Sequence, residues 1–181
     1  MNPPSVLAVI PARGGSKRFP RKNVALFRGK PLILWTIEAA RESTLLDYIV
    51  VSSEDAEILA FAATHDTHIV VRPDALATDT ATNEDVLRHA LGFYGFLVDY
   101  VVLLQPTSPL RTSADIDACI KLCVDGGAPV VSYRPDGTKN GAVYVAPVAW
   151  LADHDFDAAH VQYTMPLERS LDIDYPEQIT S

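Results

Sequence analysis

SVLAVIPARGGSKRFPRKN, residues 5–23, places a short apolar run directly before two glycines and five cationic side chains. The run over 5–11 is nearly continuous in apolar residues, which is typical of a strand covered on both faces of a sheet. The loop that follows is cationic, although the whole chain has a formal net charge of -8. The stretch therefore predicts a buried first strand that ends in a basic loop.

Short β-rich runs alternate with amphipathic segments through the first 130 residues. Further strands are predicted in the segments 48–53, 68–73, 99–106, 128–133 and 141–147, and a late strand within 167–178. Helices are predicted in 30–43, 52–66, 83–96 and 112–127, with Ser53 or Glu54 near the cap of the second. This alternation predicts a single α/β sandwich domain over residues 1–181 with a mostly parallel central sheet.

Polar segments follow the first, third and fourth predicted strands, at residues 12–23, 72–83 and 105–112. Ligands of parallel sheets bind beyond the carboxyl ends of the strands. We therefore expect these three segments to meet at one edge of the sheet.

The first of these segments has the composition of a phosphate-binding loop. Gly14 and Gly15 allow a sharp turn that brings backbone N–H groups toward an anion. The surrounding cations favour a diphosphate or triphosphate, while a solvated basic turn remains an equal alternative for Lys17, Arg18 and Arg21 taken singly. Neither a P-loop nor a GxGxxG motif is present.

Asp172 and Asp174 are two residues apart in the late predicted strand, so both carboxylates project from the same face. A divalent cation would relieve their repulsion, and Mg²⁺ commonly takes one or two carboxylates together with substrate phosphates. An exposed acidic strand face is an equally good interpretation of the spacing alone.

The remaining candidates indicate structural roles. Gln105 ends the fourth strand, where its amide can face a ligand, and Arg111 is expected to pair with Asp115 rather than with phosphate. Cys119 and Cys123 are predicted to be buried thiols on one helix face, since further soft metal ligands are absent nearby. The five histidines show no ligand spacing and no serine or cysteine partner, so a hydrolytic triad is unsupported.

The overall charge of the chain limits the classes of binding partner that are expected. The acidic net charge argues against nucleic acid and anionic membranes, while it allows a small anion in a local basic pocket. The N-terminal stretch does not resemble a signal peptide, because its apolar run is short and the positive charges follow it instead of preceding it. No apolar run reaches membrane-spanning length. A cytoplasmic protein is expected.

Five segments, taken in order, resemble the CMP-acylneuraminate (CMP-sialic acid) synthetases, a cytidylyltransferase family. They are IPARGGSKRFPRKN, LATDTATNEDV, LLQPTSPLRT, NGAVYV and ERSLDIDYPE. The resemblance covers nearly all of residues 5–177, and the first, third and fifth segments are specific. The GGSK form of the loop is more similar to this branch than to the Kdo cytidylyltransferases.

The resemblance implies a Rossmann-like nucleotidyltransferase fold, a three-layer sandwich, and a Mg²⁺-dependent reaction. CTP and a 2-keto sugar acid, sialic or a related nonulosonic acid, would give a CMP-sugar and pyrophosphate. The sugar's anomeric hydroxyl would attack the α-phosphorus, and catalysis would rest on positioning and electrostatics.

The resemblance also implies roles for particular residues. Arg13 and Lys22 would bind the triphosphate and act in catalysis with Asp174, and Asp172 and Asp174 would hold Mg²⁺. The substrate-binding residues would be Gly14, Gly15 and Ser16 through backbone donors, Asn23 near the nucleotide, Arg72 and Asn83 at cytidine, and Gln105 at the sugar. A serine is familiar in the family at the position of Asn83.

One departure concerns the acceptor. Family members carry a few dozen residues between the segments that match VVSY and NGAVYV, and these supply dimer contacts and cations for the sugar carboxylate. Here only residues 134–139 join the two strands, with Arg134 and Lys139 as the nearby cations. A smaller acceptor such as Kdo or a phosphonate, a homodimer built differently, and a non-catalytic CTP-binding remnant all remain open.

Overall fold

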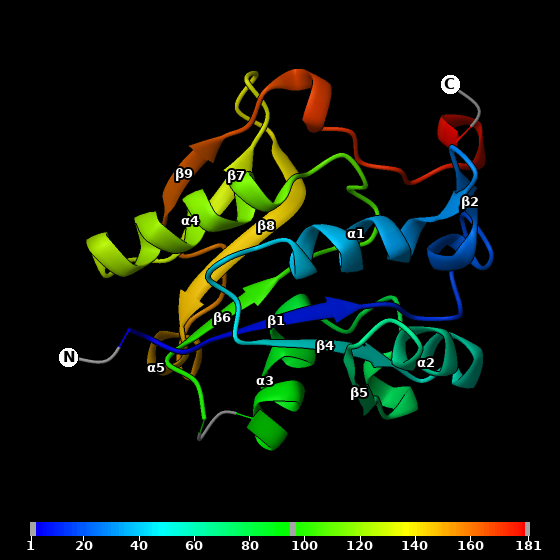
Figure 1. The fold of residues 1–181 in the computed structure, drawn as a ribbon, viewed down its shortest axis with the longest axis horizontal. Coiled ribbons are helices and arrows are strands. Elements are labelled where there is room, and N and C mark those ends of the chain that lie inside the picture. The colour runs from blue at the N-terminus through cyan, green and yellow to red at the C-terminus, as the bar shows by residue number, and fades with distance from the viewer. Residues whose placement is uncertain (1–2, 95–96, 180–181) are drawn as a thin grey trace.

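A seven-stranded sheet runs through the computed structural model, which describes residues 3–94 and 97–179 (Figure 1). The strand order is β5-β4-β1-β6-β8-β7-β9. In chain order these strands are β1 (Val6–Pro11), β4 (Tyr48–Ser53), β5 (His68–Val71), β6 (Tyr100–Leu103), β7 (Val130–Tyr133), β8 (Lys139–Pro147) and β9 (Val161–Thr164). A separate two-stranded hairpin joins β2 (Leu26–Phe27) to β3 (Lys30–Pro31).

The helices connect these strands and cover the sheet. They are α1 (Leu32–Arg41), α2 (Ala56–Ala63), α3 (Asn83–Tyr94), α4 (Ser113–Gly126) and the short α5 (Val148–Leu151). Four 3₁₀ turns lie at Lys22–Val24, Asp74–Leu76, Leu167–Arg169 and Pro176–Ile179. Residues 95–96, at the end of the third predicted helix, lie outside the described part of the chain.

The mostly parallel sheet predicted from the sequence is confirmed. Strands β5, β4, β1 and β6 pair in parallel, β7 pairs in parallel with β9, and β8 is antiparallel to both of its neighbours. The carboxyl ends of β1 and β4 point toward the side where the β2–β3 hairpin and the C-terminal end lie (Figure 1).

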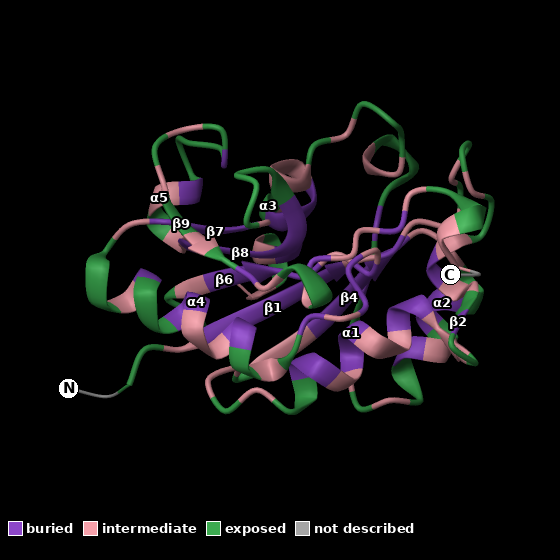
Figure 2. Ribbon diagram, turned by 90° about the horizontal axis from the view of Figure 1, so that it is seen from above, coloured by how far each residue is buried: buried purple, intermediate pink, exposed green. Residues whose placement is uncertain are grey.

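Helices cover both faces of the sheet, which makes three layers. On one face α1, α2 and α4 pack through side chains that include Ile33, Ile58 and Ile116. On the other face α3 and α5 pack through Leu87 and Leu151. Both faces of the central strands are therefore buried, as Figure 2 shows, and this explains the near-continuous apolar run of β1.

Helix ends follow local capping chemistry. Asp55, not Ser53 or Glu54, caps α2, since its side chain accepts hydrogen bonds from the N–H groups of Glu57 and Ile58. Thr112 and Asp115 form a capping box at the start of α4. The side chain of Glu54 is therefore free for another role.

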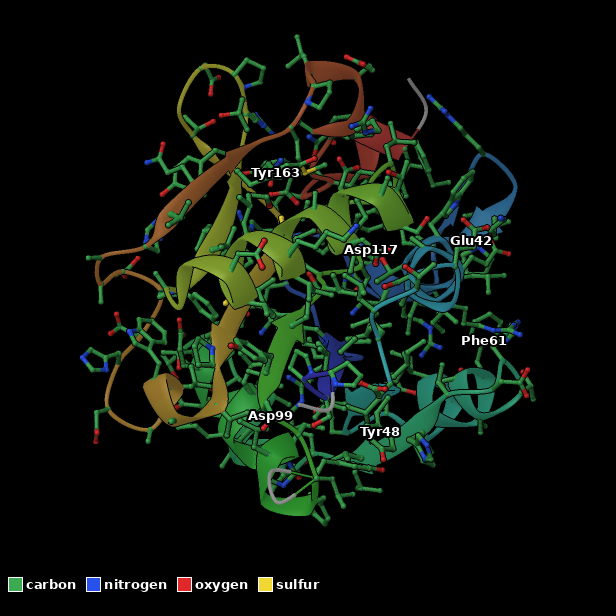
Figure 3. All side chains as sticks on the ribbon, turned by 60° about the vertical axis from the view of Figure 1, so that its left-hand side comes forward. Glu42, Tyr48, Phe61, Asp99, Asp117 and Tyr163 are labelled. Carbon is green, nitrogen blue, oxygen red and sulfur yellow. The ribbon has the colours of Figure 1, made fainter. Side chains whose placement is uncertain are left out.

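Contacts of α4 join it to its neighbours. Asp117 accepts hydrogen bonds from Ser43 and Thr44, just after α1, and Tyr163 on β9 donates to Asp115 at 3.2 Å. Figure 3 labels Asp117 on α4 and Tyr163 on β9. Both cysteines of α4 are buried and free, as predicted, and burial raises the pKa of Cys123 to about 12.

The late strand predicted within 167–178 is wrong. Residues 170–175 have no strand or helix, and 3₁₀ turns lie on both sides of them. The N–H of Ile173 donates to the carbonyl of Thr107 at 2.8 Å, while Ile173 itself is buried. The alternation of apolar and acidic residues therefore reflects a segment that places Ile173 in a small cluster with Phe27 and Leu32, and Asp172 and Asp174 at a cavity, without strand pairing.

Candidate functional site

A cavity of about 300 Å³ opens at the carboxyl ends of β1, β5 and β6. The three polar segments meet there, as the parallel order of the strands requires, and residues 172–174 close the cavity from the C-terminal side. Its walls carry nine of the predicted site residues: Arg13, Ser16, Lys22, Asn23, Arg72, Asn83, Gln105, Asp172 and Asp174.

The two glycines of the first loop lie outside this set. Gly14 donates its N–H to Glu54 Oε1 at 2.7 Å, so that donor is already engaged, in contrast to the expected phosphate contact. A Cβ atom at this position would lie 2.3 Å from Asp55 Oδ2, which explains why only glycine fits. Gly15 lines an adjoining cavity, together with Ser16 and Lys17.

Asp79 holds two cations of the first loop. Its carboxylate oxygens lie 2.8 Å from Arg13 and 2.8 Å from Lys17. Hydrogen bonds from Lys17 and then Arg13 lower the pKa of Asp79. The carboxylate of Asp79 therefore occupies the position beside Arg13, at the cavity, where the phosphate of a ligand could bind instead.

Lys22 reaches across the cavity to the C-terminal segment. Its ammonium lies 3.0 Å from Asp174 Oδ1, and Arg18 lies 3.8 Å from the same oxygen. Asn23 is buried and donates to the backbone carbonyl of Arg13 at 2.8 Å, so it also shapes the loop from within.

Asp172 is the more buried of the two acidic residues in this segment. Its Oδ1 atom is buried without a hydrogen-bond partner among the described residues. Burial is the main cause that raises the pKa of Asp172, the hydrogen bond with Thr107 opposes it, and the nearby charge of Asp174 adds to it. A buried carboxylate oxygen without a partner, beside a second carboxylate and a cavity, fits a hard cation such as Mg²⁺.

Arg72 forms the wall on the β5 side. The residue is only 5% exposed, and its Nε atom has no hydrogen-bond partner in the described chain. Burial lowers the pKa of Arg72, while Glu54, whose carboxylate lies 3.4 Å away, raises it. A buried guanidinium with an unused donor at a cavity is suited to a ligand acceptor.

Two amides meet at the far wall. Gln105 donates through Nε2 to Asn83 Oδ1 at 3.3 Å. On its other side Gln105 Oε1 would lie 2.5 Å from any Cβ atom at Gly141, whose φ angle is +70°. The glycine therefore makes room for the glutamine at the junction of β6 and β8.

Arg111 has the structural role expected for it, but with other partners. It is buried and donates to the carbonyls of Gln105 and Ala142 and to the hydroxyl of Thr36. Burial lowers the pKa of Arg111 to about 9. Asp115 pairs instead with Arg169, at 2.9 Å, so the pairing expected from the sequence is wrong.

The two cations near the shortened segment differ. Lys139 donates to the carbonyl of Phe156 and to Asp157, at 3.1 and 2.8 Å, so it is engaged in the fold. Arg134 carries a buried Nε atom that has no partner among the described residues. Neither residue lines the main cavity.

Three contributors to the site were missed from the sequence. The sequence predicts Glu54 only as a helix cap. It assigns no function to Asp79, in a polar loop, or to Thr107, in a proline-rich turn. Their positions could have indicated a role in the site, because each residue directly follows a predicted strand or lies in one of the polar segments expected to meet at the sheet edge.

Two features are absent from the described residues. None of the helices found there is long and apolar enough to cross a membrane. Groups of three or more histidine, cysteine or acidic side chains arranged to hold a metal are also absent from residues 3–94 and 97–179. A cation at Asp172 and Asp174 would thus need ligands from a substrate or from water.

Comparison with known proteins identifies relatives. A family model described as cytidylyltransferase matches residues 7–155. N-acylneuraminate cytidylyltransferase of Escherichia coli O18:K1:H7 is 33% identical over 208 residues, which cover 93% of this chain and 49% of that protein. CMP-N,N'-diacetyllegionaminic acid synthase of Legionella pneumophila is 40% identical over 141 residues, 74% of this chain and 60% of that protein.

The chain thus spans about half of the length of the first relative and three fifths of the second. The aligned stretch of the first relative, at 208 residues, is longer than this entire chain of 181. The alignment therefore contains internal positions at which this chain has no residue.

Solved structures with the same fold include CMP:2-keto-3-deoxy-manno-octonic acid synthetase complexed with CTP, with a TM-score of 0.79 at 14% identity. It covers 97% of this chain and 95% of the other. Rv0371c from Mycobacterium tuberculosis H37Rv in complex with manganese gives a TM-score of 0.71 at 18% identity, covering 97% and 96%. At these identities the likeness concerns the fold, which agrees with the predicted nucleotidyltransferase architecture.

Proposed function

The chain belongs to the cytidylyltransferase family, and from this premise we propose that it transfers CMP from CTP to a 2-keto sugar acid, releasing pyrophosphate. The observation that carries the proposal is the cavity in which Arg13 and Lys22 face Asp172 and Asp174. Cations for a triphosphate and carboxylates for a divalent metal are the two sets of groups that this reaction needs.

In this proposal the triphosphate replaces Asp79 as the partner of Arg13. Lys22 lies 3.0 Å from Asp174 and so stands next to the proposed metal ligands. Both cations neutralise the charge that grows on the α-phosphate and on the leaving pyrophosphate. The anomeric oxygen of the acceptor forms the new O–P bond and its proton passes to solvent, while the bond between the α-phosphorus and its bridging oxygen to the β-phosphate breaks and pyrophosphate leaves.

Asp172 and Asp174 are the residues that would hold Mg²⁺. When bound, Mg²⁺ would supply charge neutralisation at the phosphates and orient them for in-line attack. The buried Oδ1 atom of Asp172, which has no hydrogen-bond partner among the described residues, supports this assignment. The solved manganese complex of a protein with the same fold supports only the use of a divalent metal.

The remaining residues are assigned to substrate binding. Arg72 and Asn83 would contact cytosine, and Gln105, hydrogen-bonded to Asn83, would lie between base and sugar. Ser16 and Gly15 would face the phosphates, Gly15 from the adjoining cavity, and Asn23, on the wall of the main cavity, would approach the nucleotide while its side chain holds the carbonyl of Arg13.

Sialic or related nonulosonic acids are the first acceptors to test, because they stand in the names of the relatives. A smaller acid such as Kdo or a phosphonate is the second candidate. The observation that favours it is the hairpin at 134–138, which leaves few groups to surround a large sugar, while Lys139 is already engaged.

The test is pyrophosphate release from CTP with Mg²⁺ and a panel of nonulosonic acids, Kdo and phosphonates, repeated with UTP and ATP. We expect turnover with CTP and at least one acid, and none in the Asp174→Ala variant with its fold retained. Binding of CTP without turnover on any acceptor would support a non-catalytic remnant instead. Substantial activity in Asp174→Ala would remove that residue from the metal site.

A further inference from the structure

Glu54 touches two parts of the nucleotide cavity at once. One carboxylate oxygen accepts the N–H of Gly14 in the first loop at 2.7 Å. The other accepts from the guanidinium of Arg72 at 3.4 Å. The residue thus bridges the loop assigned to the phosphates and the side chain assigned to the base, two segments that are far apart in the sequence.

This bridge follows from the register of the sheet. The strands β1, β4 and β5 are parallel neighbours, and the chain continues the ladder beyond their ends. Ala12 donates to the carbonyl of Ser52 at 2.9 Å, and Arg72 donates to the carbonyl of Ser53 at 2.8 Å. Glu54, the residue after β4, is therefore fixed between the two neighbouring strand ends.

The charges around Arg72 make this contact consequential. Arg72 is buried, and both burial and the like charge of Arg13 lower its pKa, while Glu54 raises it. Among the described residues, Glu54 is the carboxylate in ion-pair contact with Arg72. A buried guanidinium that lost its carboxylate would be pushed away from Arg13 and would lose its fixed direction.

We propose that Glu54 is a positioning residue that sets the selectivity for cytosine, because it fixes the direction of Arg72 relative to the phosphate loop. This inference rests on the proposed function. Adjacent O2 and N3 atoms of cytosine both accept hydrogen bonds, so they match guanidinium donors. Uracil carries a donor at N3, which opposes an arginine held in the same direction.

A role in selectivity differs from a merely structural role in what it changes. If Glu54 only stabilised the fold around the cavity, its substitution would weaken CTP binding and UTP binding by the same factor. Loss of a fixed Arg72 would weaken CTP binding and leave UTP binding unchanged or improved. The ratio of the two affinities is therefore the decisive readout.

The experiment measures CTP and UTP binding by calorimetry with Mg²⁺ for the full chain and for Glu54→Gln. Glutamine keeps an oxygen for Gly14 but removes the charge that holds Arg72. We expect the CTP-to-UTP affinity ratio to fall by about tenfold or more, since hydrogen bonds to charged groups are strong. Glu57→Gln is the matched control, because Glu57 lies three residues further on, in the first turn of α2, and pairs with Arg21 at the surface.

An unchanged ratio in folded Glu54→Gln overturns the inference, as does an equal fall in Glu57→Gln. If Glu54→Gln does not fold, Glu54→Asp replaces it, since the shorter side chain withdraws the carboxylate from Arg72, and full retention of the ratio then overturns the inference. Failure of the wild-type chain to bind CTP at all is a distinct result that removes the proposed function and this inference with it.

Discussion

The two halves of the sheet are built differently. In the half that we propose for the nucleotide donor, the donor half, strands β5, β4, β1 and β6 are parallel, and the ends of β1, β5 and β6 meet at the cavity. In the half that we propose for the acceptor, the acceptor half, residues 128–164, β8 runs antiparallel between β6 and β7, β7 pairs in parallel with β9, and a tight hairpin joins β7 to β8. A parallel array concentrates polar groups at one edge, whereas an antiparallel array distributes its loops over both ends.

The difference shows in the charged side chains. In the donor half Arg13, Lys22 and Arg72 each face the cavity and each has a carboxylate partner. In the acceptor half Lys139 forms an ion pair with Asp157. This half adjoins the cavity at Gly141, which lies beside the cavity-lining residue Gln105. We therefore expect substitutions in the donor half to affect chemistry, and those in the acceptor half to affect stability first.

The largest effect is expected from Lys22→Met, which removes a donor-half cation from the cavity and from Asp174. The value of kcat/KM for CTP should fall by about 10²–10³, because a positioned charge is lost where charge develops. Steady-state pyrophosphate release measures it, with Lys121→Met on the exposed face of α4 as the control. A loss of less than about tenfold would place the triphosphate away from Lys22.

Gly141→Ala tests the boundary between the halves. Its positive φ angle should cost about 1–2 kcal/mol of unfolding free energy in denaturant titrations. The new methyl group would also displace the side chain of Gln105, so turnover should fall as well.

Gly137→Ala is the matched control in the hairpin. Its φ angle of +84° imposes similar strain, while no heavy atom of the described residues, apart from its chain neighbours, lies within 4 Å of the added Cβ. We expect a comparable loss of stability with normal turnover. Equal losses of activity in both variants would contradict a role for the Gln105 position.

A smaller effect is expected from Asp79→Asn, which removes the carboxylate that competes with phosphate for Arg13 and Lys17. CTP binding should become tighter, by less than about tenfold because exposed ion pairs are weak. Calorimetry at low ionic strength measures it, and Asp136→Asn in the hairpin serves as the acceptor-half control. Weaker CTP binding would show that Asp79 contributes to the bound state instead.

The smallest effect concerns stability at the junction. Because the pKa of Asp172 is raised in the folded state, principally by burial, the unfolded chain releases this proton first as the pH rises. The ionised carboxylate therefore lowers stability at neutral pH, and Asp172→Asn should raise the Tm at pH 7 without metal. The gain should vanish below the ordinary aspartate pKa of about 3.9. A lower Tm at pH 7 would mean that nearby cations outweigh burial.

The donor half was largely predictable from the sequence. The apolar run of β1, the Gly14–Gly15 pair and the strand alternation fixed the fold class and the place of the cavity, because both faces of β1 are buried. Strand β9 was missed, since three of its four residues are exposed and it reads as a polar loop. The partners of Gly14 and Arg111 depend on contacts between distant segments, which local patterns do not encode.

The hairpin between β7 and β8 has a consequence for chain insertion. Arg134 donates its N–H to the carbonyl of Thr138 at 2.8 Å, so the two ends of the turn are already adjacent. A longer segment inserted between these two residues could begin and end at the same positions, so the strands would not have to move. The entropic cost of closing the loop would grow only with the logarithm of its length. The turn is therefore a suitable graft site, at which loops of different lengths can be exchanged while the cavity proposed for the nucleotide is kept.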